Sequence, residues 1–503
     1  MKKILLFGAG KSATVLIDYL LKNALLEDWT VTVVDANLSL AQSKIGNALA
    51  GQALSFDIND AAERGTHIQQ ADIVISLLPP ALHILVAKDC ISYKKNLLTA
   101  SYVDEQMRNL EQSILDSNIL FLCEMGLDPG IDHMSAKKMI DTIEANGGKI
   151  TSFYSHCGGL VAPENDNNPW HYKISWNPRN VVMAGKAGAI FKEDGADKEM
   201  PYEKLFAEKR FVEIPNHESL CWYPNRDSLS YIPVYGLTEC ETFIRTTLRH
   251  PDFMYGWRNI IELKLTDEQK QYETDGVTLK TFFKEHFEKY GFSNWIQEQM
   301  QEQFQTSKKI LEDLVNLVEL EGKVDEAGGE SVDDFMMVNE KGNLQQIDLD
   351  ELKTSAAATV AYKMHEAKLT LQQLFFLGMD DNQTVINKGL CSAADVLQFA
   401  LETKLGLQAG DKDLVVMVHE IEYAVQEKNF KETASLLITG DNDVQTAMAK
   451  TVGLPLGIAA KLILNGTIKA KGLRIPIVKE IYEPVLLELA TNNIIFHETL
   501  TQV

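Results

Sequence analysis

Two aspartates and a histidine stand close together in the segment "CEMGLDPGIDHM", which runs from Cys123 to Met134. The apolar run "NILFL" before it predicts a strand, and the residues after it have the spacing of a helix. Carboxylates and imidazoles are common proton carriers in enzymes. Asp128 is therefore a candidate acid or base at the end of a strand. The competing interpretation is an Asp that shapes the turn before Pro129 by bonding to backbone amides.

The two polar residues that begin the expected helix favour structural interpretations. Asp132 fits an N-cap, whose side-chain oxygen accepts hydrogen bonds from free N–H groups. His133 is more often a packed or capping histidine than a base. Cys157, in the segment "HCGG", is expected to be a small buried thiol rather than a residue of the site.

A glycine motif near the N-terminus predicts a nucleotide site. The apolar run "ILLF" is typical of a strand buried on both faces, and "GAGKSA" with helical spacing follows it. A second strand, "WTVTVVDAN", ends in Asp35. In this dinucleotide-binding pattern Gly8 makes the tight turn, Gly10 admits a pyrophosphate and Ala13 packs helix on strand. Asp35 is expected to accept ribose hydroxyls, which disfavours a 2′-phosphate.

The ends of later strands supply further candidates. "ADIVISLLPP" (71–80) and "KNLLTASYV" (95–103) read as two more buried strands. Ligands of doubly wound sheets bind beyond the carboxyl ends of the strands. Leu78, Ala100, Ser101 and Tyr102 are therefore candidate walls of a crevice for nicotinamide and substrate, and ordinary loop residues are the alternative.

After about residue 130 the pattern changes to alternating strands and long loops, which predicts a mixed or antiparallel sheet. "YPNRDS" and "FIRTTLRH" bring in Arg226, Arg245 and Arg249. Guanidinium groups bind carboxylates through two hydrogen bonds, so this cluster suits an anionic substrate. On these residues alone, surface salt bridges are the favoured interpretation.

Composition narrows the classes of protein. The chain has 503 residues, a net charge of -23 and 45% hydrophobic residues. Such an acidic globular chain lacks the basic surface that nucleic acid and anionic lipid need. We expect neither as a partner. The six cysteines have no metal-ligand spacing, so we expect no metal site, free thiols and a cytoplasmic location.

Residues 257–405 read as charged helices, with a flexible acidic connector at 323–348. The segment "TAMAKTVGLPLGIAAKLILNG" predicts a helix rich in small residues, able to pack closely on a neighbour. We see no span of apolar residues that predicts a membrane helix.

Several motifs together resemble the glutamate-forming saccharopine dehydrogenases, also called saccharopine reductases. They are "ISLLPPALHILVAKDCI", "TASYVDEQM", "GLDPGIDHM", "CGGLVAPE", "YPNRDS", "TLRH" and "TAMAKTVGLP…KGL". The resemblance covers about 1–255 and 410–490 in the same order. It departs at His156, where the family usually has Tyr, and at Pro80, where it has an aromatic residue.

The resemblance implies an α/β fold of three domains. These are a Rossmann dinucleotide-binding domain (1–130, completed by part of 440–490), a mixed α/β substrate and dimerisation domain (131–256 and 406–503), and a helical lid insertion (257–405). It also implies a homodimer.

The resemblance carries the family's contacts over to this sequence. The nucleotide contacts fall on Gly8, Gly10, Lys11, Ser12, Ala13, Asp35, Leu78, Ala100 and Asp128. The saccharopine contacts fall on Ser101, Tyr102, Arg226, Thr247, Leu248 and Arg249. Members that use NADP carry an Arg at the end of the second strand, whereas "VVDAN" offers Asp35, so we predict NAD over NADP.

The implied activity interconverts saccharopine, NAD(P)+ and water with L-glutamate, aminoadipate semialdehyde and NAD(P)H, in lysine metabolism. The substrate would be a small molecule with several carboxylates, and Asp128 is the candidate acid or base. Two alternatives stay open. One is a related reductase that joins a polyamine to an aldehyde, of the carboxynorspermidine or homospermidine type. The other is a nucleotide-sensing protein without catalysis.

Overall fold

The computed structural model describes residues 1–326, 335–338, 344–347 and 349–503, and of residues 317–326, 335–338, 344–347 and 349–352 only the backbone. The chain forms two compact units. One holds residues 1–167, 171–251 and 405–503, and the other holds 168–170 and 252–404. All of the predicted site residues lie in the first unit.

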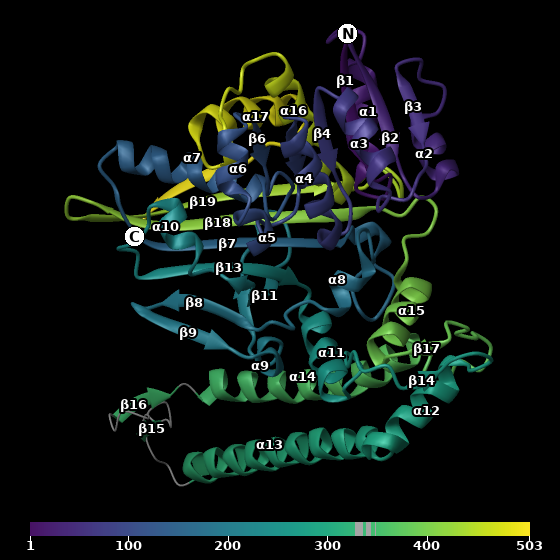
Figure 1. Ribbon diagram of the computed structural model, residues 1–503. Coiled ribbons are helices and arrows are strands. Elements are labelled where there is room, and N and C mark those ends of the chain that lie inside the picture. The colour runs from purple at the N-terminus through teal and green to yellow at the C-terminus, as the bar shows by residue number, and fades with distance from the viewer. Residues whose placement is uncertain (327–334, 339–343, 348) are drawn as a thin grey trace. The chain divides into compact units, whose positions relative to one another are not determined.

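The first sheet of this unit is parallel, with seven strands in the order β20-β6-β5-β4-β1-β2-β3 (Figure 1). Its strands are β1 Lys2–Phe7, β2 Trp29–Val34, β3 Gly51–Leu54, β4 Ile73–Ser76, β5 Asn96–Thr99, β6 Leu120–Leu122 and β20 Gly472–Arg474. β1 pairs with β2 on one side and β4 on the other, so the strand order reverses there. Such a reversal opens a crevice for a dinucleotide. The expected Rossmann fold is confirmed.

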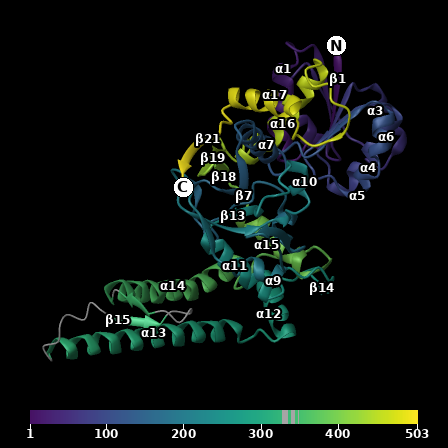
Figure 2. The same cartoon turned by 90° about the vertical axis from the view of Figure 1, so that its left-hand side faces the viewer.

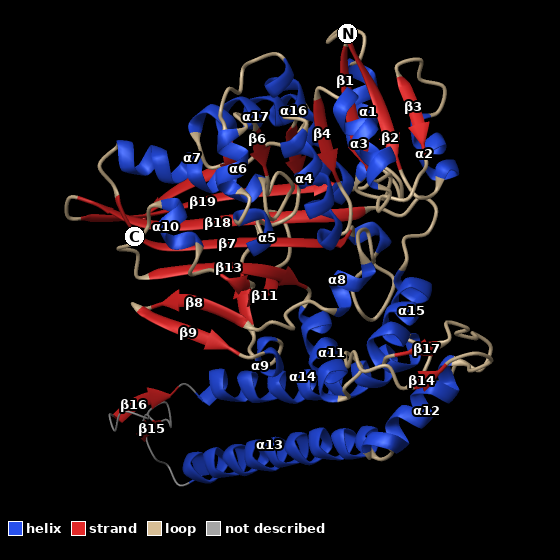
Figure 3. Cartoon of the chain, viewed as in Figure 1, coloured by secondary structure: helices blue, strands red, loops and turns tan. Residues whose placement is uncertain are grey.

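Helices cover both faces of this sheet (Figure 3). They include α1 Ala13–Asn23, α2 Leu38–Ile45, α3 Ala61–Gln70 and α4 His83–Ser92. Alternate residues of β1 enter different cores, because neighbours in a strand point to opposite faces. Ile4 and Leu6 join one core, and Leu5 and Phe7 join the other. The continuous apolar run of β1 is thereby explained by burial on both sides.

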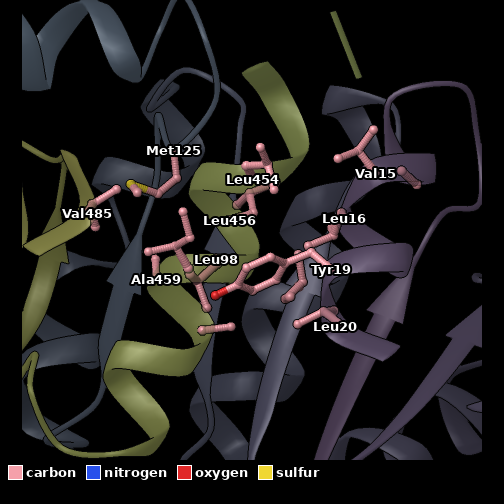
Figure 4. Packing of buried hydrophobic residues seen from close by; sticks show 14 of the residues in the cluster. Val15, Leu16, Tyr19, Leu20, Leu98, Met125, Leu454, Leu456, Ala459 and Val485 are labelled. Atoms are coloured by element: carbon pink, nitrogen blue, oxygen red, sulfur yellow. The ribbon is translucent and has the colours of Figure 1, made fainter. Parts of the chain in front are cut away.

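The small-residue segment forms α16 Ala447–Leu464, which packs on α1 (Figure 4). A Cβ on Gly453 would lie 2.8 Å from the backbone N of Leu16, and one on Gly457 would meet the Tyr19 ring. Only glycine permits this approach. α16 has the length and apolar composition of a membrane helix, but 72% of it is buried inside the unit. A buried core helix satisfies the same criteria, and nothing else among the described residues does.

The second sheet has the mixed character that the sequence predicted. Its main path runs β10-β11-β13-β7-β18-β19-β21. These strands are β7 Lys149–Val161, β10 Arg210–Val212, β11 Leu220–Pro224, β13 Thr242–Arg249, β18 Asp413–Val425, β19 Lys428–Thr439 and β21 His497–Gln502. β13 pairs with β7 in parallel, whereas β7 and β18 are antiparallel. α7 Ile131–Ala145 packs on one face of this sheet.

The second unit is mostly helical. Its main helices are α11 Pro251–Glu262, α12 Leu279–Tyr290, α13 Trp295–Glu326, α14 Leu349–Phe376 and α15 Ala393–Leu405. α13 and α14 run side by side (Figure 2). Of the acidic connector predicted at 323–348, residues 327–334, 339–343 and 348 lie outside the described residues. Two short strands within it, β15 Phe335–Val338 and β16 Leu344–Ile347, pair with each other.

Candidate active site

The glycine turn joins β1 to α1 at the strand-order reversal. Gly8 has a φ of +101°, and a Cβ there would lie 2.8 Å from the carbonyl oxygen of Leu77, so the turn requires glycine. Gly10 is exposed, and no atom lies within 4 Å of where its Cβ would be. Ser12, the N-cap of α1, makes no side-chain capping bond. The helix N-terminus therefore presents open space beside backbone amides, which fits a pyrophosphate.

Asp35 is tied to this turn. Its Oδ2 accepts a hydrogen bond from the backbone N of Ala9 at 2.8 Å, and its Oδ1 accepts one from the backbone N of Asn37 at 2.9 Å. The carboxylate is half-buried next to the turn. A negative charge is therefore held where the ribose of a bound dinucleotide would lie.

Asp128 lies at the carboxyl edge of the same sheet, in the loop that follows β6. Its Oδ1 accepts hydrogen bonds from the Tyr102 hydroxyl at 3.0 Å and from Nη2 of Arg245 at 2.6 Å. The same Nη2 donates to Oδ2 of Asp132 at 2.8 Å. Arg245 comes from β13, so one guanidinium joins the loops of the first sheet to the second sheet. The Asp128 carboxylate therefore binds side chains of other elements, which the interpretation as a turn-forming residue did not include.

Asp132 is not the N-cap that the sequence predicted. Gly130 occupies that position, and Asp132 lies in the first turn of α7. Its Oδ1 accepts the backbone N–H of Gly130 at 2.6 Å, and its other oxygen pairs with Arg245. The carboxylate thus reaches back to the N-cap amide while it also binds a buried cation. The second role depends on a residue 113 positions away.

His133 is packed, as the sequence predicted. It is fully buried, and its ring nitrogens contact Oε2 of Glu124 at 2.8 Å and the hydroxyl of Tyr235 at 2.5 Å. Glu124 also accepts from the backbone N of Val103 and the hydroxyl of Tyr231, each at 3.0 Å. Since Val103 directly follows the candidate residues 101 and 102, Glu124 holds that loop in place.

Burial and charge set the ionisation of the cluster. Arg245 is 3% exposed; burial opposes its charge, but Tyr102 and the two aspartates raise its pKa well above the usual value. Burial raises the pKa of Asp128, and Arg245 only partly offsets this. Burial also opposes ionisation of Asp132, but His133 and Arg245 lower its pKa. Asp132 is thus the permanent counter-ion of Arg245, and Asp128 is the carboxyl that gains a proton more easily.

The predicted substrate residues of β13 divide between the two faces of the sheet. Arg245, Thr247 and Arg249 alternate along the strand and therefore share the face of the cluster. Leu248 points to the opposite face, where it is fully buried and pairs in register with Trp222. Its side chain cannot line the same site as Thr247. Leu248 contributes there through its backbone carbonyl, which accepts from Nη1 of Arg249 at 2.7 Å.

The two predicted carboxylate-binding arginines differ in exposure. Arg226 is exposed, and its guanidinium carbon lies 5.4 Å from the centre of the Tyr102 ring. Arg249 is buried, with its guanidinium carbon 5.4 Å from the centre of the Tyr172 ring. Cys157 is also buried, and burial raises the pKa of its thiol, which therefore stays protonated. Arg245, the third arginine of the predicted cluster, forms its salt bridges with Asp128 and Asp132 in the interior, whereas the sequence alone favoured salt bridges at the surface.

Ser101 belongs to a chain of polar side chains below the ends of β4 and β5. His83 contacts the Oγ of Ser76 through Nδ1 and the Oγ of Ser101 through Nε2, each at 2.8 Å. Leu78 and Ala100 lie half-buried at the same two strand ends, and Lys11 is exposed at the glycine turn.

Sequence reasoning assigned no role in the site to His83 or Glu124, and it grouped Arg245 with two other arginines without placing it. His83 in "ALHIL" and Glu124 beside Cys123 match no spacing that marks a catalytic or ligand-binding residue. Their partners come from other elements, so only the fold reveals them. One signal was available, because Arg245 and Arg249 are four residues apart in a predicted strand and must share a face.

Replacement of Arg245 by Met should leave two buried carboxylates without their shared cation. We expect a loss of about 3–5 kcal/mol in the free energy of unfolding near pH 8, measured by urea denaturation. Without Arg245, burial and mutual repulsion raise both pKa values. Protonation then becomes easier, so the loss should shrink as the pH falls to about 5.

Arg474→Met is the matched control, since Arg474 is an exposed arginine of the same unit. Its effect should stay within about 0.5 kcal/mol. An Arg245→Met protein as stable as the parent at both pH values would contradict the assignment of Arg245 as the shared cation.

Comparison with known families gives two matches along the chain. Residues 4–122 match the saccharopine dehydrogenase NADP binding domain, and residues 126–331 and 333–495 match the saccharopine dehydrogenase C-terminal domain. Together these cover most of both sheets, except β21, and include Tyr102, Asp128, Asp132 and Arg245.

Two fungal relatives match this chain over nearly the full length of both proteins. Saccharopine dehydrogenase (NADP(+), L-glutamate-forming) of Saccharomyces cerevisiae is 32% identical over 97% of this chain and 96% of its own. The protein of the same name from Schizosaccharomyces pombe is 30% identical over 99% of both chains. Alpha-aminoadipic semialdehyde synthase of Arabidopsis thaliana is 31% identical over 96% of this chain, which spans only 43% of that longer protein.

Solved structures agree as well. Apo saccharopine dehydrogenase (L-Glu forming) from Saccharomyces cerevisiae superposes with a TM-score of 0.77 at 28% identity and covers 100% of both chains. The homospermidine synthase from Legionella pneumophila, in complex with NAD, has a TM-score of 0.51 at 8% identity and shares the fold alone. On the family matches and the full-length relatives, the chain belongs to the saccharopine dehydrogenase family.

Proposed function

We propose that this protein is an L-glutamate-forming saccharopine dehydrogenase. It would interconvert saccharopine, a pyridine nucleotide and water with L-glutamate, aminoadipate semialdehyde and the reduced nucleotide. The observation that carries the proposal is the full-length similarity to fungal enzymes of that name. The matches cover at least 96% of this chain and of each fungal relative. The acid cluster and the arginines around Tyr102 support it.

The residue types suit a substrate with three carboxylates and a secondary amine. The exposed guanidinium of Arg226 beside Tyr102 is available for one carboxylate. Thr247 and Arg249 share the face of Arg245 and would hold a second. Arg245 is already paired with two aspartates, so its charge holds these residues in place and is not available for a substrate carboxylate.

The chemistry needs a proton acceptor for the amine. The glycine turn would hold the nucleotide, whose nicotinamide would supply the hydride acceptor for the methylene carbon next to the amine. In the oxidative direction the amine would first give up its proton. Water adds to the resulting imine, and the carbon–nitrogen bond breaks to give semialdehyde and glutamate. Most of the rate would come from orientation of the reactants. Asp128 is the proposed acceptor of a proton, because it lies at the carboxyl edge and its pKa is raised by burial.

Asp128→Asn should lower kcat by about a hundredfold or more, because an amide accepts no proton. The parent should lose activity as the pH falls and Asp128 becomes protonated, and this acidic limb should disappear in the variant. Steady-state rates across pH test both points. Asp227→Asn, at an exposed aspartate of β12 Arg226–Asp227, is the control and should behave as the parent. An unchanged acidic limb in Asp128→Asn would remove Asp128 as the proton acceptor.

The cofactor is a pyridine nucleotide, and we propose NAD rather than NADP. The fungal relatives are named for NADP(+), so this proposal rests on the residues of this chain. Asp35 ends β2 with both oxygens held by backbone amides, which fixes its charge in place. A 2′-phosphate at this position would meet a carboxylate, whereas a ribose hydroxyl would donate to it.

The first measurement is NADH oxidation with aminoadipate semialdehyde and glutamate, compared with NADPH. We expect turnover with NADH to exceed turnover with NADPH. Asp35→Asn keeps an oxygen for the Ala9 amide but removes the charge, so it should shift the ratio toward NADPH by about tenfold. Asp116→Asn, at an exposed aspartate, should leave the ratio unchanged.

The outcomes separate the two proposals. A preference for NADPH in the parent would keep the reaction and overturn the choice of NAD. Absence of turnover with either nucleotide, while NADH still binds, would overturn the reaction and favour a polyamine substrate or a sensing role.

We also propose a homodimer, a cytoplasmic location and the three-domain division given above, with 257–405 as a lid.

For the dimer, β21 offers a surface, because it ends the second sheet and all six of its residues are exposed. An uncovered edge strand is a template for pairing with another strand. Sedimentation equilibrium should give twice the chain mass, and Leu500→Pro, which removes one edge N–H, should shift it toward the monomer. A monomeric parent would refute the dimer.

A further inference from the structure

His83 is a buried polar residue to which the reaction above gives no role. It is the first residue of α4, directly after the turn that "PPAL" forms from Pro79 to Leu82. This turn brings its ring beneath the carboxyl ends of β4 and β5. The ring is 5% exposed and lies between two serine hydroxyls, those of Ser76 and Ser101, each at 2.8 Å.

The protonation of this chain of groups follows from burial. Burial lowers the pKa of His83 to about 4, with nearby Asp104 acting only weakly against it, so the imidazole is neutral near pH 7. A neutral imidazole has one N–H donor and one acceptor nitrogen. His83 makes one 2.8 Å hydrogen bond at each ring nitrogen, to Ser76 and to Ser101, and these two bonds must therefore run in the same direction along the chain. The Oγ1 of Thr99 also contacts Nε2, but at 3.4 Å this bond is long and weak.

The hydroxyl of Ser76 determines in which direction the hydrogen bonds through His83 run. It is fully buried, and among the described residues its hydroxyl has one hydrogen-bond partner, Nδ1 of His83. A hydroxyl carries a single hydrogen, and a buried donor without an acceptor is costly. That hydrogen therefore goes to Nδ1. The imidazole proton is then on Nε2 and points at the Oγ of Ser101.

The remaining bonds of Ser101 fix its position. Its backbone N donates to Oγ1 of Thr99 at 3.2 Å, and its carbonyl accepts from the backbone N of Glu124 at 3.1 Å. Its Oγ accepts the hydrogen bond from the Nε2–H of His83 and still has its own hydrogen to donate. Ser101 is half-buried at the edge of the crevice, next to Tyr102, so this hydrogen is free to point outward.

We propose that His83 is a positioning residue that donates to Ser101 and so makes the Ser101 hydroxyl a dedicated donor to a substrate carboxylate. The proposal rests on the function above for the identity of the ligand. The other tautomer of His83 is incompatible with the proposal. With the proton on Nδ1, Ser101 would donate its hydrogen to the imidazole and offer an anion only lone pairs.

Kinetics of variants test the coupling. Ser101→Ala and His83→Leu should each raise the KM for the carboxylate substrate about tenfold, with kcat and the KM for the nucleotide nearly unchanged, since the lost bond serves binding. The double variant should be no worse than either single one. His83→Gln, which keeps an N–H donor near the position of Nε2, should stay within about threefold of the parent. His217→Leu is the control, because His217 is half-buried and, among the described residues, its ring hydrogen-bonds only to the backbone carbonyl of Glu218.

A spectroscopic measurement tests the proton assignment without turnover. The protein contains 11 histidines, so 15N labelling of histidine gives a countable spectrum, and His83→Gln identifies the signal of His83. We expect a proton on Nε2 and a bare Nδ1 throughout neutral pH. A proton on Nδ1, or a substrate KM unchanged in a folded His83→Leu protein, or additive losses in the double variant would each overturn the proposal. If the parent shows no turnover, the function fails, while the tautomer of His83 is still decided. If His83→Leu does not fold, Ser101→Ala, His83→Gln and the spectrum decide the outcome.

Discussion

The first unit depends on one buried cation. Arg245 belongs to the second sheet, and both of its carboxylate partners belong to the loop and helix that leave the first sheet. Its side chain is 4% exposed, so its charge requires compensation by groups at hydrogen-bond distance. That requirement fixes Asp128 and Asp132 relative to β13, and with them the edge at which a nucleotide and a substrate would meet.

The neighbours of this cation form a second layer that orders the site. Asp132 stays ionised and balances the charge of Arg245, because His133 and Arg245 lower the pKa of its carboxyl. Asp128 shares the same guanidinium but keeps a raised pKa. Two carboxyls with pKa values pushed apart by their surroundings are suited to different tasks. Glu124 then connects the cluster to the loop of Ser101 and Tyr102, so the acid, the loop and the arginine face are parts of one hydrogen-bonded body.

The sequence predicted what local patterns encode. The buried β1 strand, the glycine turn and Asp35 at the end of β2 are neighbours in the chain, and their order alone defines a dinucleotide fold. The mixed character of the second sheet followed from alternation. Asp132 was misassigned because a first-turn aspartate resembles an N-cap until its distant partner is known. Leu248 and Thr247 were both carried over from the family resemblance, although a strand turns adjacent side chains to opposite faces.

Other parts of the site were hidden for a related reason. His83 and Ser101 are 18 residues apart in different elements, and no spacing rule links them. Their contact exists because parallel strands bring their ends together at one edge. Long-range polar pairs of this kind depend on topology, which pattern reading establishes only in outline.

The return of the chain to its first sheet has a consequence for how the molecule is made. β20 pairs with β6 across about 350 residues, and α16 supplies the glycines against which α1 packs. A polypeptide emerging from the ribosome therefore displays β6 as an open edge, and α1 with an uncovered apolar face, until most of the chain is synthesised. Chains that stop before residue 447 lack the helix that covers α1, so the element behind the glycine turn stays unpacked until residues 447–464 have been made.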